Sequence, residues 1–179
     1  AVTLEITPNG DGKHAIDQTE FYRVLESTRG PIISVIKDVD YIPGRGAVLG
    51  DGDAVMRKAL GVKGIVVDGS IRDLVGIKRV GIPVWATGSV PGHGVFSHVN
   101  YNTIVNVAGL TIKPGDLLVA DEDGCTKIPC EVDPAIVLEK SRVIEAREKE
   151  LHNYVESSEF DLEYVFDNRE KWVGRSGKK

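Results

Sequence analysis

The first half of the chain alternates between short apolar runs and stretches with helical spacing. Residues 1–6 alternate apolar and polar side chains, which predicts a half-buried strand. Apolar runs rich in β-branched residues predict further strands at 31–39, 63–68 and 81–86. Helical spacing predicts a helix over 17–27, with Phe21, Val24 and Leu25 facing the core. A second helix is predicted over 53–60, with Val55, Met56, Ala59 and Leu60 facing the core, and a third begins at about Ser70. This order is typical of parallel βαβ units.

The second half reads as hairpins followed by one long helix. Short strand-like runs separated by turns lie at 103–107, 110–112, 117–120 and 126–128. Pro134 suits the first turn of a helix that we expect to run to about Val155. Its apolar stripe, Val137, Ile144, Leu151 and Val155, would dock on a core or on a neighbouring subunit. From Trp172 we expect a frayed tail.

Composition narrows the class of protein. The chain has 179 residues and a mass of 19.4 kDa, enough for one domain with a real core. A net charge of −5, with Lys and Arg spread along the chain, disfavours a nucleic-acid partner. No apolar run approaches the roughly 20 residues of a membrane helix, and the first residues lack the features of a signal peptide. Two cysteines, Cys125 and Cys130, fit a reduced, cytoplasmic protein.

A glycine-rich segment, Gly44–Gly50, lies between a predicted strand and a predicted helix. Its spacing departs from the GxGxxG fingerprint of dinucleotide folds, because the third glycine comes one place late. A plain turn and a small-anion site remain open, since backbone N–H groups at a helix start attract carboxylate or phosphate.

A second motif, Asp68-Gly-Ser-Ile-Arg-Asp73, allows two interpretations. Ser70 could cap a helix, with Asp73 closing a capping box and Arg72 in solvent. Alternatively, Arg72 and Asp73 follow a buried parallel strand at the edge where α/β sheets bind ligands. Arg would then hold a carboxylate, and Asp would offer hard oxygen to Mg²⁺.

Histidine and cysteine chemistry is weakly indicated. His93 and His98 flank a loop-like segment, and their spacing gives little support for a metal site. The chain has no GxSxG elbow, and neither cysteine has an obvious paired base, which disfavours a covalent nucleophile.

Several motifs together resemble the RraA-like family, which includes metal-dependent 4-hydroxy-4-methyl-2-oxoglutarate aldolases and the RraA regulators of ribonuclease E. The resemblance rests on Gly64–Asp73, Gly81–Gly88, Ile112–Gly124 with Ile128-Pro129, and the early strand Ala1–Leu4. It implies an α/β domain with a mixed central sheet flanked by helices, of the swivelling β/β/α kind, ending in a long helix. We expect this domain over residues 1–158, without the family's N-terminal helical leader, and a partly disordered extension over 159–179.

The resemblance also implies site residues. The family's enzymes carry an acidic residue, twenty intervening residues and then Arg-Asp, which Asp51, Arg72 and Asp73 match. By resemblance, Asp73 binds Mg²⁺ or Mn²⁺, Arg72 holds the 2-oxo acid and its developing charge, and Asp51 orients a metal-bound water. The backbone of Gly50, Asp51, Gly52 and Asp53 would receive the substrate carboxylate. Glu148 is the expected metal-approaching glutamate from an adjacent subunit, with Glu145 and Glu150 as rivals.

The implied activity is retro-aldol cleavage of 4-hydroxy-2-oxo acids to pyruvate through a stabilised enolate, with oxaloacetate decarboxylation by the same route. The implied assembly is a homotrimer, or a hexamer of stacked trimers. One departure favours the alternative, a non-catalytic regulator that binds a ribonuclease. The enzymes commonly have Glu or Asp three places after the Arg-Asp aspartate, where this chain has Gly76. Loss of a supporting carboxylate can weaken metal binding about 10–100-fold.

Overall fold

The computed structural model describes residues 1–11, 13 and 15–173. The chain divides into two compact units, Ala1–Pro129 and the part from Cys130 onwards. Each unit is described here by itself.

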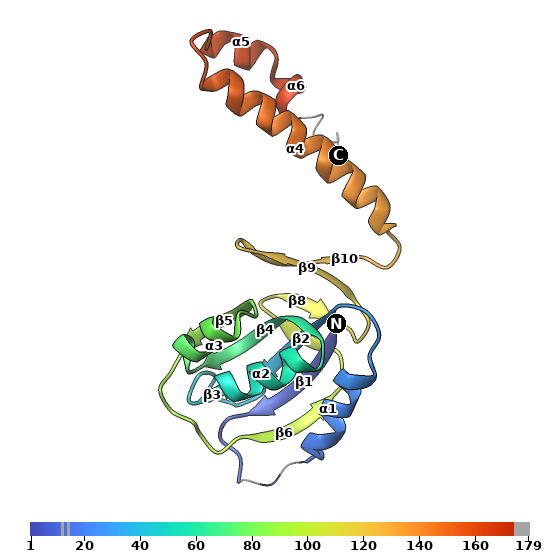
Figure 1. Ribbon diagram of the computed structural model, residues 1–179, viewed down its shortest axis with the longest axis vertical. Coiled ribbons are helices and arrows are strands. Elements are labelled where there is room, and N and C mark those ends of the chain that lie inside the picture. Colours follow the sequence, from blue (N-terminus) through green and yellow to red (C-terminus); the bar gives the residue numbers. More distant parts are fainter. Residues whose placement is uncertain (12, 14, 174–179) are drawn as a thin grey trace. The chain divides into compact units, whose positions relative to one another are not determined.

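The first unit is built on a six-stranded mixed sheet (Figure 1). Its strands are β1 Val2–Thr7, β2 Ile32–Asp38, β3 Ala47–Leu49, β4 Val62–Ile71, β5 Val84–Ser89 and β6 Ser97–Tyr101. Strands β1 to β5 pair in parallel, and β6 runs antiparallel to β1. The expected mixed α/β fold is therefore confirmed.

Strand β4 is the longest strand of the sheet and organises the rest. Strand β5 pairs along one edge of β4 as far as Ile71. Strand β2 pairs with β4 up to Asp68, and β3 takes over at Ser70 and Ile71. Because β5 already occupies one edge at Ser70 and Ile71, β3 must continue the edge that β2 begins.

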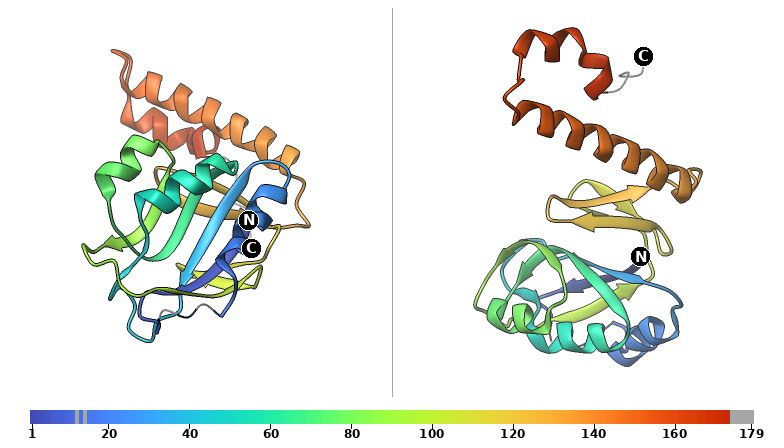
Figure 2. Two further views of the ribbon diagram at one scale, coloured as in Figure 1. Left: turned by 60° about the horizontal axis from the view of Figure 1, so that its bottom comes forward. Right: turned by 45° about the horizontal axis from the view of Figure 1, so that its top comes forward.

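The two faces of this sheet have separate cores (Figure 2, right). On one face pack α1 Gln18–Ser27, α2 Asp51–Ala59 and α3 Leu74–Val80, burying Phe21, Leu25, Ala54 and Ile77. On the other face lie two hairpins, β7 Val105–Val107 with β8 Leu110–Ile112, and β9 Leu117–Asp121 with β10 Gly124–Ile128. Val35 and Val66 of the sheet share a core with Val107, Ile112 and Leu118 of the hairpins.

The second unit consists of α4 Pro134–Val155, α5 Leu162–Asp167 and α6 Arg169–Val173. Asp133 caps α4 by accepting a hydrogen bond from the Ala135 N–H, and Pro134 occupies the first turn, as the sequence predicts. The Tyr154 and Trp172 rings stack with centroids 6.1 Å apart, which ties α6 to α4. The stripe residue Ile144 is 54% exposed. The frayed tail expected from Trp172 was placed too early, because Trp172 lies in α6 and is buried. Residues 174–179 of the expected tail lie outside the described residues.

Three local predictions were wrong. The helix expected from Ser70 begins at Leu74, because Ser70 and Ile71 stay in β4, paired on both edges. On α2 the buried residues are Ala54 and Arg57, whereas Val55 and Met56 are about half exposed. His98, expected in a loop, is buried on β6. In the described part of the chain, no helix has the length and apolar character needed to cross a membrane.

Candidate functional site

The candidate site forms where β3 and β4 end together. Leu49, the last residue of β3, pairs with Ile71, the last residue of β4. The Arg72 N–H then donates a 2.9 Å hydrogen bond to the Leu49 carbonyl. This register brings Gly50 and Arg72 side by side at the carboxyl edge of the sheet, where ligands of parallel α/β sheets bind.

Gly50 leaves the room that Arg72 and Asp73 occupy. A Cβ built on Gly50 would lie 2.8 Å from Asp73 Oδ2 and 3.1 Å from Arg72 Nε. The Arg72 guanidinium and the Asp73 carboxylate form a 3.2 Å ion pair, and each side chain is about one third exposed. Both groups therefore remain open to a ligand. The structure brings Gly50, Arg72 and Asp73 together, and their role in binding a ligand stays a prediction.

Asp73 precedes α3 in a left-handed conformation, with φ of 59°. Within the described part of the chain, its side chain makes no capping hydrogen bond to α3. Since Ser70 is a strand residue, the capping-box interpretation of this motif is wrong. A non-glycine residue at positive φ costs conformational energy and persists only where its surroundings hold it in that conformation, and such residues cluster at functional sites.

The start of α2 faces the same edge. Gly50 is the N-cap residue, and glycine has no side chain with which to cap the first N–H groups of the helix. The N–H groups of Asp51, Gly52 and Asp53 thus precede the first intrahelical hydrogen bond, from Ala54 N–H to the Gly50 carbonyl. Such a bare helix start accepts carboxylate or phosphate groups.

The Asp53 side chain has a structural task that the sequence analysis missed. It accepts hydrogen bonds from Arg57 Nε at 3.0 Å and from the Tyr22 hydroxyl at 2.9 Å. Arg57 is fully buried, also donates to Ser34 Oγ, and lies 4.9 Å from the centre of the Phe21 ring. Burial, followed by the Asp53 charge, raises the pKa of Tyr22 to about 12. The i, i+4 spacing of Asp53 and Arg57 was the available signal.

Asp51 begins α2 and points toward α3. A Cβ built on Gly76 of α3 would lie 2.1 Å from Asp51 Oδ2. The position where the family's enzymes commonly carry an acid therefore faces the Asp51 carboxylate itself.

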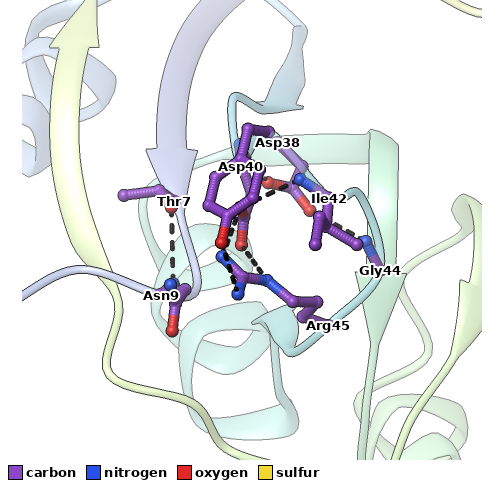
Figure 3. A network of polar contacts seen from close by, with 8 residues as sticks. Thr7, Asn9, Asp38, Asp40, Ile42, Gly44 and Arg45 are labelled. Atoms are coloured by element: carbon purple, nitrogen blue, oxygen red, sulfur yellow. Dashed lines mark hydrogen bonds and ion pairs between the residues drawn. The ribbon is translucent and has the colours of Figure 1, made fainter.

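The glycine-rich segment Gly44–Gly50 begins as a loop held by side-chain hydrogen bonds, and it is not a phosphate-binding loop (Figure 3). Asp38 accepts hydrogen bonds from the N–H groups of Asp40 and Gly44, and Arg45 donates two to Asp40, at 3.0 and 2.7 Å. These bonds from Arg45 hold the pKa of the Asp40 carboxyl below its ordinary value. Gly44 has φ of 82°, which favours glycine. Because β3 interrupts the segment, only Gly50 stands at a helix start, so the dinucleotide layout is wrong.

Asp73 is the one carboxylate beside Arg72 and Gly50 that the sequence analysis expects to hold a divalent cation. Asp73 offers a partly exposed carboxylate, a hard oxygen ligand, and Mg²⁺ is usually bound by one or two carboxylates plus substrate oxygens and water. Among residues 1–11, 13 and 15–173, no three His, Cys, Asp or Glu side chains form a metal-binding group. Glu148 is exposed on α4, in the second unit, and its role stays a prediction.

Comparison with known proteins shows to which protein family the chain is similar. A family profile described as RraA-like (Aldolase/RraA) matches residues 1–126. A Halalkalibacterium halodurans protein provisionally named 4-hydroxy-4-methyl-2-oxoglutarate aldolase is 34% identical over 120 residues, covering 60% of this chain and 57% of that protein. A Dechloromonas aromatica protein with the same provisional name is 38% identical over 81 residues, covering 45% of this chain and 50% of that protein. The chain thus spans about half the length of these curated relatives.

Solved structures agree with this assignment. Streptomyces coelicolor RraAS2, described as an unusual member of the RNase ES inhibitor RraA protein family, is 29% identical with a TM-score of 0.63. The match covers 85% of this chain and 73% of that chain. The chain is thus similar in sequence to a protein provisionally named as an aldolase and in structure to a member of a ribonuclease-inhibitor family. By the profile match over most of its length, the chain belongs to the RraA-like family.

Proposed function

We propose that this protein is a carbon–carbon lyase that cleaves 4-hydroxy-2-oxo acids, of the 4-hydroxy-4-methyl-2-oxoglutarate type, to pyruvate. The observation that carries the proposal is the convergence of Arg72, Asp73 and the bare start of α2 on Gly50. A carboxylate-bearing substrate needs an anion acceptor, and its enolate product needs a fixed positive charge beside it. This edge of the sheet offers both.

Substrate binding uses the backbone first. The N–H groups of Gly50, Asp51, Gly52 and Asp53, at the start of α2, donate hydrogen bonds to the 2-oxo acid carboxylate. Arg72, partly exposed beside them, presents a planar fork that can hold the carboxylate and keto oxygens together. Asp53 contributes its N–H group only, because its carboxylate is engaged by Arg57 and Tyr22.

Cleavage of the C3–C4 bond leaves an electron pair on pyruvate, delocalised as its enolate. The Arg72 guanidinium places a positive charge beside this developing negative charge and so stabilises it. Asp73, with substrate oxygens, would hold Mg²⁺ or Mn²⁺, and when bound the ion supplies Lewis-acid stabilisation of the same charge. Asp51 orients the water that takes the C4 hydroxyl proton as the C4 carbonyl forms, and the enolate then takes up a proton at C3 to give pyruvate. Oxaloacetate would lose CO₂ to the same enolate, with no hydroxyl proton to remove.

The site of one chain is open, and we propose that a neighbouring copy covers it in a homotrimer or a hexamer. Arg72 and Asp73 remain about one third exposed, and α4 has no buried residue among those described. In this arrangement Glu148 of α4 would approach the metal held by Asp73 of the adjacent copy.

The test is a pyruvate-release assay on 4-hydroxy-4-methyl-2-oxoglutarate and on oxaloacetate. Each substrate is incubated with the protein and Mg²⁺, Mn²⁺ or EDTA, and pyruvate is measured with lactate dehydrogenase. We expect release that depends on the divalent ion and falls about 10²–10³-fold in Arg72→Ala. Release no faster than in the EDTA control, across both substrates and both ions, contradicts the proposal.

A second candidate, a protein-binding regulator of a ribonuclease, is favoured by the similarity to Streptomyces coelicolor RraAS2. A regulator acts through its surface and has no use for turnover. An inactive protein that binds and inhibits a ribonuclease E-type enzyme equally well with and without Arg72→Ala supports this candidate instead.

A further inference from the structure

The Asp51 side chain lies so close to the backbone of Gly76 that no side chain would fit at position 76. A Cβ built on Gly76 would lie 2.1 Å from Oδ2, 2.6 Å from Cβ and 2.7 Å from Cγ of Asp51. All three distances are below the 3.0 Å that real Cβ atoms respect. The Asp51 side chain therefore fills the space that any side chain at position 76 would need.

This approach cannot be relieved by turning one side chain. The Cβ atom of Asp51 is fixed to the backbone of α2, so rotation about χ1 moves the carboxylate but leaves the 2.6 Å contact in place. Relief requires α2 and α3 to move apart. Both helices are fixed to one core, α2 by the buried Ala54 and Arg57 and α3 by the buried Ile77.

The contact also sets where Asp51 stands relative to the candidate site. Gly76 lies one turn after Asp73 on α3, while Asp51 directly follows Gly50, against which Arg72 and Asp73 pack. Two carboxylates and two glycines thus interlock: Asp73 of the α3 start lies over Gly50, and Asp51 of the α2 start lies over Gly76.

We propose that Gly76 is a positioning residue, whose missing side chain lets Asp51 lie against α3 and holds it in register with Arg72 and Asp73. The inference rests on the proposed function, because it assigns Asp51 a place in the proton transfer. It also reverses the expectation drawn from the family pattern. Gly76 is not a lost carboxylate in this chain, and an acid restored there would displace the one that Asp51 supplies.

The proposed reactions separate this role from a purely structural one. Aldol cleavage requires removal of the C4 hydroxyl proton, whereas oxaloacetate decarboxylation does not. A misplaced Asp51 should therefore impair cleavage selectively, while general damage to the fold should impair both reactions. A misplacement of about 1 Å can cost on the order of 10² in rate.

The experiment compares Gly76→Ala and Gly76→Asp with the parent, using kcat for both reactions in the presence of Mg²⁺. We expect kcat for cleavage to fall at least tenfold more than kcat for decarboxylation in both variants, with a smaller change in KM. Gly64→Ala is the matched control: its Cβ would lie 3.0 Å from the Trp85 ring, near the opposite end of β4, so it should destabilise without changing the ratio of the two rates. Equal losses in both reactions, no loss, or faster cleavage in Gly76→Asp overturns the proposal.

A stability measurement keeps this inference separate from the proposed activity. Gly76→Ala should lower the urea midpoint of the parent but raise it in an Asp51→Gly background, since Ala is the better helix former once the contact is gone. A parent without either activity refutes the proposed function, and the urea midpoints then still test the contact. A loss of the same size in both backgrounds overturns the inference.

Discussion

The most demanding prediction for the fold concerns Arg57, because it is a fully buried charge that binds Asp53 in the first turn of α2. Its guanidinium donates to Asp53 and Ser34 and lies over the Phe21 ring. The change Arg57→Met keeps an unbranched side chain of similar length and removes only the charge and the donors. The loss of stability therefore reports on the polar network rather than on a large cavity.

The magnitude follows from what each partner loses. Ser34 is fully buried, so its hydroxyl would lose its partner at a cost of about 1–3 kcal/mol. Asp53 is 23% exposed and keeps the Tyr22 hydroxyl and access to water, so its share is about 1 kcal/mol. The lost contact with Phe21 adds about 0.5–1 kcal/mol. We expect a total loss of about 3 kcal/mol, or a fall in Tm of about 6–12 °C for a domain of this size.

The assay is urea unfolding followed by the fluorescence of Trp85, in a Trp172→Phe background that removes the signal of the second unit. Arg79→Met on α3 is the matched control, because Arg79 is exposed and its loss should stay within about 0.5 kcal/mol. An Arg57→Met variant as stable as this control would refute the reasoning.

Three further predictions concern the site and its support. Arg72→Lys should lower pyruvate release about as much as Arg72→Ala while Tm stays within a few degrees, because a point charge cannot replace the planar fork; full activity in Arg72→Lys speaks against bidentate binding. Gly50→Ala should lower kcat/KM at least tenfold, because the new Cβ would displace the side-chain ends of Arg72 and Asp73. The Tm should change little, since those ends can move and the φ of −125° at Gly50 suits alanine. Unchanged kinetics would argue against this close packing. The raised pKa of Tyr22, about 12 against 10.0, means that the folded state holds this proton more tightly, so stability should decline as pH rises from about 10 to about 12. Alkaline unfolding monitored by circular dichroism should lose that component in Tyr22→Phe, and identical pH curves for the two proteins would contradict it.

The sequence predicted most elements of the fold because their signals were local. The parallel strands β1, β2, β4 and β5, the two hairpins and α4 with its Pro134 start carry periodicity or turn residues that tertiary structure leaves intact, whereas the short strand β3 was not predicted. Strand β4 was predicted too short, because Asp68-Gly69 has turn propensity. Pairing with β3 and β5 on both edges overrides that preference at Ser70 and Ile71.

The prediction of the buried face of α2 was wrong for a different reason. Apolar residues were expected inward, yet the inward position is held by Arg57, whose burial depends on Asp53 nearby and on Ser34 from β2. A partner 23 residues away cannot be read from helical spacing. The approach of Asp51 to Gly76 is equally non-local, since it depends on how α2 and α3 pack. Sequence spacing could identify Arg72 and Asp73 as a pair, but not that Gly50 makes room for them and that Gly76 makes room for Asp51.

The central claim, that Arg72 and a divalent ion held by Asp73 stabilise a pyruvate enolate, can be tested without knowing the physiological substrate. Pyruvate in D₂O exchanges its methyl protons when an enolate forms, and the loss of the methyl signal is followed by proton NMR. We predict that the protein accelerates this exchange in the presence of Mg²⁺, and that both EDTA and Arg72→Ala slow it by about 10²-fold or more. Exchange at the rate of buffer with Mg²⁺ alone, or equally fast exchange with Arg72→Ala, would contradict the claim.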